Sequence, residues 1–270
     1  YEVTLNDLND AIVEKAKAGI EKMLQKNVSK GRMTEEAMAA AMARLTVTAD
    51  LSAAADADLV IEAAVEKVEI KKSIFAKLSD ICAEDAILAS NTSSISIVEL
   101  ASAVKNPNRF IGMHFFSPVP LMRLLEIVRS IATDDETVAA AKAVGGKLGK
   151  TCIVSKDKPA FIVNRMLDPM LNEAIAILEA GTGSIEDIDT GMKCGLNHPM
   201  GPLELLDMAG IDVELAVMEV LYRETGDPKY RPAGLLRDMV RIGWLGRKTG
   251  IGFYVYHEDG TREPNPALCR

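Results

Sequence analysis

Three residues with side chains suited to proton transfer lie within one short stretch of the chain, namely Ser93, His114 and Glu126. Histidine is the side chain whose ordinary pKa, about 6.5, lies nearest to neutral pH, and a carboxylate partner orients it. A histidine and a glutamate that meet in the fold can therefore take up a proton and return it. The serine could act as a nucleophile in a hydrolase-like triad or as a hydrogen-bond donor. Because Phe115 and Phe116 follow His114, a buried structural histidine is a further interpretation.

Composition and charge exclude several classes of function. The 270 residues are 48% hydrophobic, enough to bury the core of one large domain or two ordinary ones. The formal net charge of −8 argues against a nucleic-acid surface, and no apolar run approaches the roughly 20 residues that span a bilayer. Three histidines and four scattered cysteines without C-x-x-C spacing give no metal cluster. We expect a cytoplasmic protein without a metal, a nucleic-acid partner or a membrane anchor.

Short apolar runs alternate with helical patterns in the first part of the chain, which has to position these side chains. Strands are predicted around residues 1–7, 45–48, 58–64, 86–90, 109–113 and 123–128, and helices over 9–26, after Thr34, and over 68–82, 95–104 and 135–148. Strands that alternate with helices are typical of βαβ units. The sequence therefore predicts an α/β fold with a mostly parallel, doubly wound sheet of the Rossmann type.

The composition changes near residues 156–159, so we place a domain boundary there and predict domains at 1–156 and 157–270. Helical patterns dominate the second domain, over residues 161–178, 184–193, 203–222 and 232–241. We expect an all-helical domain whose apolar residues form a core or a subunit interface.

Acidic residues at strand ends suggest a nucleotide site. In a Rossmann fold an acid at the end of the second strand, about 20 residues after a glycine-rich turn, binds the adenosine ribose, and such an acid favours NAD over NADP. Asp7 stands at that position, which predicts that the turn precedes residue 1 of a truncated chain; a plain helix cap is the alternative. Without that turn we expect weak NADH binding. The run 59–66 is typical of a buried strand whose C-terminal end places Glu66 in a loop, and Lys71 follows on the next helix. Both residues could instead be ordinary solvated charges.

A second glycine-rich segment, residues 246–252, has the composition of a phosphate loop. Residues 253–256, Phe-Tyr-Val-Tyr, follow it and predict no helix. Because phosphate loops depend on a helix N-terminus, we exclude this role.

Seven motifs resemble, in order, those of the L-3-hydroxyacyl-CoA dehydrogenase family, in its bacterial branch. They are residues 58–63 (DLVIEA), 89–94 (ASNTSS), 112–116 (GMHFF), 118–120 (PVP), 161–165 (FIVNR), 197–205 (NHPMGPLEL) and 246–250 (GRKTG). The resemblance extends over nearly the whole chain, and only the family's first strand, glycine loop and helix have no counterpart in it.

The resemblance implies an NAD-dependent oxidoreductase that interconverts (S)-3-hydroxyacyl-CoA, in particular 3-hydroxybutyryl-CoA, and 3-oxoacyl-CoA in butyrate or fatty-acid metabolism. It implies His114 as the catalytic base, Glu126 as its partner, and Ser93 and Asn164 around the reacting oxygen. It places these residues at the cofactor: Asp7, Ala63, Glu66, Lys71, Asn91, Ser93, Ser117 and Lys248.

The acyl-CoA substrate and the partner chain are implied in the same way. The resemblance places Lys30 and Ser93 at coenzyme A; Lys22, Lys26 and Lys30 share one helix face, ordinarily a solvated one. It also implies a homodimer formed through the helical domain. Three departures concern Ser117, Ala160 and Met23, where the family usually has Asn, Gly and Ser.

Two further functions remain open. The same fold resembles a lens crystallin, an inactive structural protein, although the presence of His114, Glu126, Ser93 and Asn164 argues against that role. The chain could also be a fragment of a multifunctional fatty-acid oxidation enzyme, which a preceding hydratase domain would identify.

Overall fold

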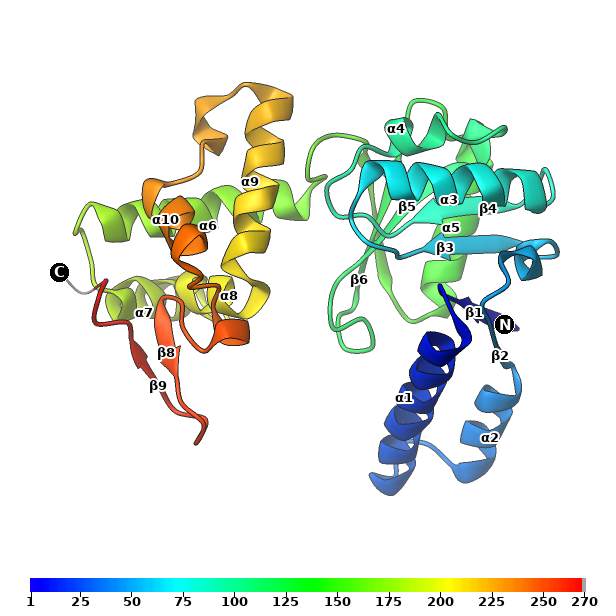
Figure 1. Ribbon diagram of the computed structural model, residues 1–270, viewed down its shortest axis with the longest axis horizontal. Helices are drawn as coiled ribbons and strands as arrows, with labels where there is room; N and C mark the ends of the chain where they lie inside the picture. The colour runs from blue at the N-terminus through cyan, green and yellow to red at the C-terminus, as the bar shows by residue number, and fades with distance from the viewer. Residues whose placement is uncertain (269–270) are drawn as a thin grey trace. The chain divides into compact units, whose positions relative to one another are not determined.

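The computed structural model describes residues 1–268 and divides them into two compact units. The first comprises residues 1–91 and 97–153; the second comprises 92–96 and the chain from Val154 onward (Figure 1). The main division lies between Ile153 and Val154, and the short segment Thr92–Ser96 groups with the second unit. Cys269 lies outside the described residues.

A five-stranded sheet organises the first unit. Its strands, in spatial order, are β3 (Leu59–Glu62), β4 (Ile87–Ser90), β5 (Phe110–Phe115), β6 (Leu124–Arg129) and β7 (Thr151–Lys156). β3, β4 and β5 run parallel, whereas β6 pairs with β5 antiparallel. The helices α3 (Val68–Ile81), α4 (Ile97–Ala101) and α5 (Asp135–Lys147) connect these strands.

Side chains of β5 alternate between two helical layers, as a strand's period of two requires. Phe110 packs its ring edge against Phe75 of α3, with 4.6 Å between ring centroids. Ile111 belongs to the opposite cluster, which includes Ala141 of α5. Helices therefore cover both faces of this sheet (Figure 1), the arrangement of a doubly wound α/β fold.

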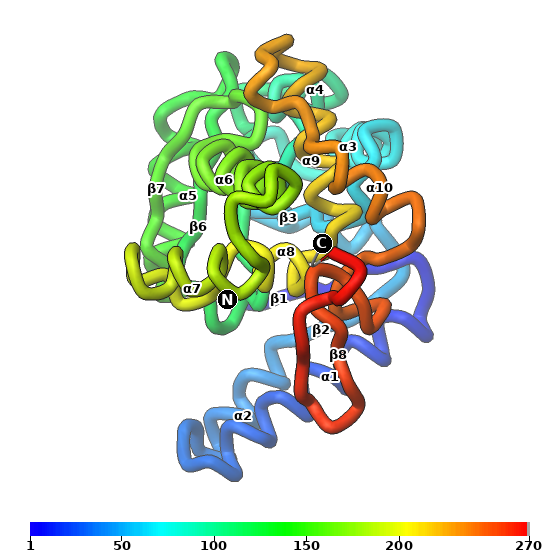
Figure 2. Tube along the Cα trace, turned by 90° about the vertical axis from the view of Figure 1, so that its left-hand side faces the viewer, coloured from blue at the N-terminus to red at the C-terminus, as the bar shows by residue number. Residues whose placement is uncertain are grey.

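A second, two-stranded parallel sheet pairs β1 (Val3–Asn6) with β2 (Leu45–Thr48). Between these strands the chain forms a helical hairpin of α1 (Asp10–Ser29) and α2 (Glu35–Ala43), which lie side by side in both views (Figures 1 and 2). The strands predicted as one doubly wound sheet thus fall into two sheets, because the described strand pairs join β1 only to β2 and β3 only to β4.

Helices form most of the second unit. They are α6 (Val163–Glu179), α7 (Ile185–Leu196), α8 (Pro202–Ala209), α9 (Ile211–Thr225) and α10 (Gly234–Ile242). Buried Leu, Ile and Met side chains from these helices form the main core cluster together with Phe253 and Tyr254, and Met218 and Leu221 of α9 belong to a second cluster. The unit also has a small antiparallel sheet of β8 (Tyr254–Tyr256) and β9 (Arg262–Pro264), which is an addition to the all-helical domain predicted.

Two predictions about elements need correction. The single helix predicted over 203–222 is two helices, because the backbone of Gly210 has φ 109° and ends the helical path there. The strand β7 was not predicted, since its short run has only two strongly apolar residues, Ile153 and Val154.

Candidate active site

Two neighbouring strands bring His114 and Glu126 together. In the antiparallel register of β5 and β6 these residues are direct partners, so their side chains leave the same face of the sheet. His114 Nδ1 lies 3.2 Å from Glu126 Oε2, and the two side chains are 7% and 0% exposed. The ring of Phe116 lies 4.4 Å from the imidazole, between ring centroids. The structure therefore brings together the imidazole and the carboxylate that the sequence suggested as a pair.

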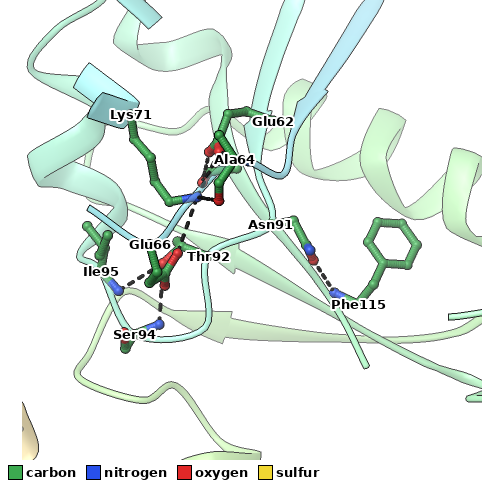
Figure 3. A network of polar contacts seen from close by, with 10 residues as sticks. Glu62, Ala64, Glu66, Lys71, Asn91, Thr92, Ser94, Ile95 and Phe115 are labelled. Atoms are coloured by element: carbon green, nitrogen blue, oxygen red, sulfur yellow. Dashed lines mark hydrogen bonds and ion pairs between the residues drawn. The ribbon is translucent and has the colours of Figure 1, made fainter. Parts of the chain in front are cut away.

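In the sheet, the parallel strands β3 and β4 precede β5, the strand that carries His114. A loop follows the carboxyl end of each of these two strands. Ala63 and Glu66 follow β3 and are exposed, while Asn91 follows β4. Asn91 Oδ1 accepts the backbone N–H of Phe115 at 2.8 Å, which ties the end of β4 to the residue after His114 (Figure 3). The carboxyl ends of parallel strands are where doubly wound folds bind nucleotides.

Lys71 of α3 is buried beneath the loop after β3. Its ammonium group forms ion pairs with Glu62 at 2.7 Å and with Glu66 at 3.2 Å (Figure 3). The expectation of an ordinary solvated lysine is therefore wrong for Lys71. Sequence reasoning did not identify Glu62, although a charged residue that ends an apolar strand was a signal for it.

Asp7 follows β1 and is exposed. The helix-cap alternative for Asp7 is wrong, because Asn9 caps α1 and accepts the N–H of Ile12. Asp7 Oδ1 instead accepts the adjacent N–H of Leu8 at 2.7 Å. Its carboxylate therefore stands at a strand end, where a ribose-binding acid is expected.

The positions of Lys30 and Ser117 are both exposed. Lys30 is the C-cap residue of α1 and lies at the turn toward α2, the end of the hairpin that is away from β1 and β2 (Figure 1). Ser117 belongs to the loop that connects β5 to β6. Both side chains can be reached from solvent.

Three of the predicted site residues, Ser93, Asn164 and Lys248, belong to the second unit. Ser93 lies in a turn that the Thr92 side chain closes by accepting the N–H of Ile95 at 3.0 Å (Figure 3). Asn164 lies in the first turn of α6, and Lys248 forms an ion pair with Asp212.

A strained turn precedes Asn164. Ala160 and Phe161 have φ angles of 59° and 53°, in the left-handed region that non-glycine residues rarely adopt. Both side chains are buried. Such strain persists only where packing holds it, and it is frequent at functional sites.

The glycine-rich segment 246–252 surrounds a buried carboxylate. Asp207 of α8 accepts the N–H groups of Phe253 at 2.9 Å and Tyr254 at 2.8 Å. Burial raises the pKa of Asp207 to about 6. A Cβ on Gly246 or Gly252 would overlap Asp207. The glycines thus allow close approach of the backbone, which is a structural role.

Residues 1–268 contain neither a metal-binding cluster nor a helix that could span a membrane. These residues contain no group of three or more His, Cys, Asp or Glu side chains that could hold a metal ion. No helix among them is long and apolar enough to cross a membrane.

Two family profiles match the chain. The profile described as 3-hydroxyacyl-CoA dehydrogenase, NAD binding domain, matches residues 1–158. The profile described as 3-hydroxyacyl-CoA dehydrogenase, C-terminal domain, matches residues 161–256. Together they cover the first unit and most of the second.

Individual relatives agree with these profiles. The chain is 52% identical over 256 residues to a 3-hydroxybutyryl-CoA dehydrogenase of Bradyrhizobium diazoefficiens, covering 95% of this chain and 87% of the relative. It is 40% identical to the mitochondrial hydroxyacyl-coenzyme A dehydrogenase of Sus scrofa, covering 95% and 84%. The crystal structure of (S)-3-hydroxybutyryl-CoA dehydrogenase from Ralstonia eutropha superposes with a TM-score of 0.93 at 49% identity, covering 95% and 91%. The chain therefore belongs to the 3-hydroxyacyl-CoA dehydrogenase family, and its first part is that family's NAD-binding domain.

Proposed function

We propose that this protein is an NAD-dependent dehydrogenase that interconverts (S)-3-hydroxyacyl-CoA and 3-oxoacyl-CoA, with 3-hydroxybutyryl-CoA as its substrate, in butyrate or fatty-acid metabolism. The observation that carries the proposal is the buried pair of His114 and Glu126 in a chain of this family. An inert structural protein has no need of a buried histidine and carboxylate, whose removal from water costs free energy.

The pair divides the proton chemistry between its two side chains. Glu126 accepts Nδ1–H of His114, so the other ring nitrogen, Nε2, is the one that takes the proton of the substrate's 3-hydroxyl group. The Glu126 carboxylate stabilises the imidazolium that results. Ser93 and Asn164 donate hydrogen bonds to the same substrate oxygen as it becomes a ketone oxygen. NAD, when bound, supplies the acceptor for the hydride that leaves C3.

The chain's own polar residues fit a dinucleotide. The exposed Asp7 carboxylate is suited to the ribose hydroxyls and would repel the additional phosphate of NADP. Glu66 and Asn91 follow the carboxyl ends of parallel strands, and the small side chain of Ala63 would let the cofactor approach the backbone closely. The proposed site also includes Lys71, Ser93, Ser117 and Lys248.

Coenzyme A is the proposed ligand of Lys30 and Ser93. Lys30 is exposed, and a lysine on a chain with net charge −8 provides a local attraction for phosphate groups. We also propose a homodimer formed through the helical unit and a cytoplasmic location. Exposed Met166 and Leu196 on α6 and α7 support an interface, and the unpaired thiols of Cys82, Cys152 and Cys194 support a reducing compartment.

The proposal is tested by an assay of NADH oxidation by the purified chain with acetoacetyl-CoA. We expect conversion to 3-hydroxybutyryl-CoA, with a far higher kcat/KM for NADH than for NADPH. Free acetoacetate, which lacks coenzyme A, should be a poor substrate because the binding energy of the carrier is missing. Equal turnover of the thioester and the free acid would contradict the assignment to acyl-CoA substrates.

A further inference from the structure

A hydrogen bond joins the turn that carries Ser93 to the chain that leads into α6. Ser96 Oγ donates to Asp157 Oδ2 at 2.9 Å, although the two residues are 61 positions apart in sequence. Both residues belong to the second unit, as do Ser93 and Asn164. Ser96 and Asp157 are half-buried, so water competes less for this bond than it would at an exposed site. The bond therefore connects the two segments that supply the proposed hydrogen-bond donors to the substrate oxygen.

Local contacts close the turn on the Ser93 side of this bond. Thr92 Oγ1 accepts the N–H of Ile95 at 3.0 Å and the N–H of Ser94 at 3.3 Å (Figure 3). Thr92 itself is only 1% exposed. Ser93 therefore lies in a turn that is held at one end by the buried Thr92 and at the other end by the bond from Ser96.

The chain on the Asn164 side of the bond is also firmly held. Between Asp157 and Asn164, the N–H of Phe161 donates to the Lys158 carbonyl oxygen at 2.9 Å. Ala160 and Phe161, which have left-handed φ angles, are 1% and 4% exposed. Because a non-glycine residue keeps such a conformation only where its surroundings impose it, this turn is a stiff connection between Asp157 and α6.

We propose that Ser96 and Asp157 are positioning residues for Ser93, which hold its hydroxyl group in place relative to Asn164 so that both donate to one substrate oxygen. This inference rests on the proposed function, because it takes Ser93 and Asn164 as the groups around the reacting oxygen. Donors stabilise developing charge best when they are already in place, since no energy is then spent on reorganisation during the reaction. Ser96 and Asp157 act through Ser93 and do not touch the substrate themselves.

Coupled substitutions at Ser93 and Ser96 provide the test. Ser96→Ala should lower kcat for acetoacetyl-CoA reduction about tenfold, because a displaced Ser93 hydroxyl stabilises the transition state less well. In a Ser93→Ala background the same substitution should change kcat by less than about twofold, since the hydroxyl through which Ser96 acts is then absent. An equal loss in both backgrounds would overturn the proposal, because Ser96 would then act independently of Ser93.

Two further serine variants serve as controls. Ser96→Thr retains a hydroxyl group that can donate to Asp157 and should keep kcat within about twofold of the unsubstituted value. Ser102→Ala removes a hydroxyl at the other end of α4, which donates to the Glu99 carbonyl oxygen at 2.7 Å, and should leave kcat unchanged. A loss of kcat in Ser102→Ala as large as that in Ser96→Ala would mean that the effect comes from a weakened α4, which contradicts the proposal.

Removal of the acceptor tests the same bond from its other side. Asp157→Ala should lower kcat at least as much as Ser96→Ala does. Adding Ser96→Ala to Asp157→Ala should change kcat by less than about twofold, because the bond is already lost. An Asp157→Ala variant with the unsubstituted kcat would show that the bond has no positioning role.

Amide hydrogen exchange in the protein without ligand gives a readout that does not need turnover. Ser96→Ala should accelerate exchange of the Ile95 amide about tenfold, because the turn that protects this amide loses its attachment to Asp157. The amides in the middle of α6 should exchange as before. Unchanged exchange at Ile95 would overturn the inference. Faster exchange with an unchanged kcat would also overturn it, because order in the turn would then not govern catalysis.

Failure of this inference can be told apart from failure of the proposed function. If the unsubstituted protein reduces acetoacetyl-CoA and Ser96→Ala keeps its kcat, only the positioning role is refuted. If the unsubstituted protein does not reduce the thioester, the proposed function fails and the inference fails with it. Should Ser96→Ala not fold, as circular dichroism would show, Asp157→Ala with and without Ser93→Ala decides the question.

Discussion

His114 and Glu126 are twelve residues apart in sequence, yet the antiparallel register of β5 and β6 makes them direct neighbours. The strands hold both backbones in place, so the two side chains are positioned for contact without further rearrangement of the chain. Burial of the pair removes competing water, which strengthens the interaction between imidazole and carboxylate. The proposed proton transfer therefore depends on strand pairing as much as on the two residue types.

Replacement of the carboxylate tests this residue-level account. Glu126→Gln keeps the size of the side chain but removes the charge that stabilises the imidazolium, so kcat should fall about 10²-fold or more while KM for NADH changes little. Steady-state kinetics with acetoacetyl-CoA measure both constants. The exposed Glu136→Gln serves as a control of equal charge change. A kcat for Glu126→Gln close to that of the control would mean that Glu126 is only structural.

Sequence patterns predicted four of the five strands of the larger sheet, β3 to β6, and the helices that pack against it, because buried strands and amphipathic helices leave periodic apolar residues. They also predicted His114 and Glu126 as a pair, which the strand register brings together, but they did not point to Glu62, whose buried contacts with Lys71 and Ser90 appear only in the structure. Likewise, the break at Gly210 lies inside a continuous helical pattern and is visible only from the backbone angle of that residue. In each case the missed feature depends on a contact or a backbone angle that sequence patterns do not reveal.

The glycine-rich segment allows a stability prediction for one element. Gly252→Ala should lower the free energy of unfolding by about 2–3 kcal/mol, because its Cβ would push on the Asp207 carboxylate that holds Phe253 and Tyr254. Gly195→Ala in α7, where a Cβ meets open space, should instead be neutral or stabilising by up to about 1 kcal/mol. Denaturant titrations compare the two. Equal effects at both positions would contradict the structural role of the segment.

The tip of the α1–α2 hairpin offers a test of coenzyme A binding. Lys30→Ala should raise KM for acetoacetyl-CoA several-fold, more at low salt than at high salt, because exposed charges are screened. KM for NADH should not change. Lys15→Ala, on the same helix, is the matched control. If Lys30→Ala affects both substrates equally, or neither, Lys30 does not belong to the acyl-CoA site.

At the scale of the whole molecule, two acidic residues of the helical unit make stability depend on pH. Asp168 of α6 and Glu214 of α9 are each 5% exposed, and each has a buried oxygen without a hydrogen-bond partner among residues 1–268. Burial raises the pKa of Asp168, and burial together with the nearby Asp168 raises the pKa of Glu214. The folded state therefore binds protons that the unfolded chain has released, so stability falls as the pH rises above the ordinary carboxyl range.

Asp168→Asn should reduce this loss of stability at high pH. We expect it to raise the free energy of unfolding by about 1–3 kcal/mol at about pH 8, where a buried charge is removed, and to change it little at about pH 5, where Asp168 is protonated in the fold. Thermal unfolding at both pH values measures the difference. Glu173→Gln, exposed on the same helix, should have no such pH dependence. A stabilisation of Asp168→Asn that is equal at both pH values would contradict the assigned titration.

We propose that His114 exchanges the proton of the 3-hydroxyl group of an acyl-CoA substrate. The most direct measurement compares kcat for acetoacetyl-CoA reduction by the unsubstituted protein and by His114→Gln, with circular dichroism and the Kd for NADH recorded for both. We predict a loss of about 10²-fold to 10⁴-fold in kcat, with the fold and the Kd retained. A His114→Gln variant that turns over at nearly the unsubstituted rate would contradict the account.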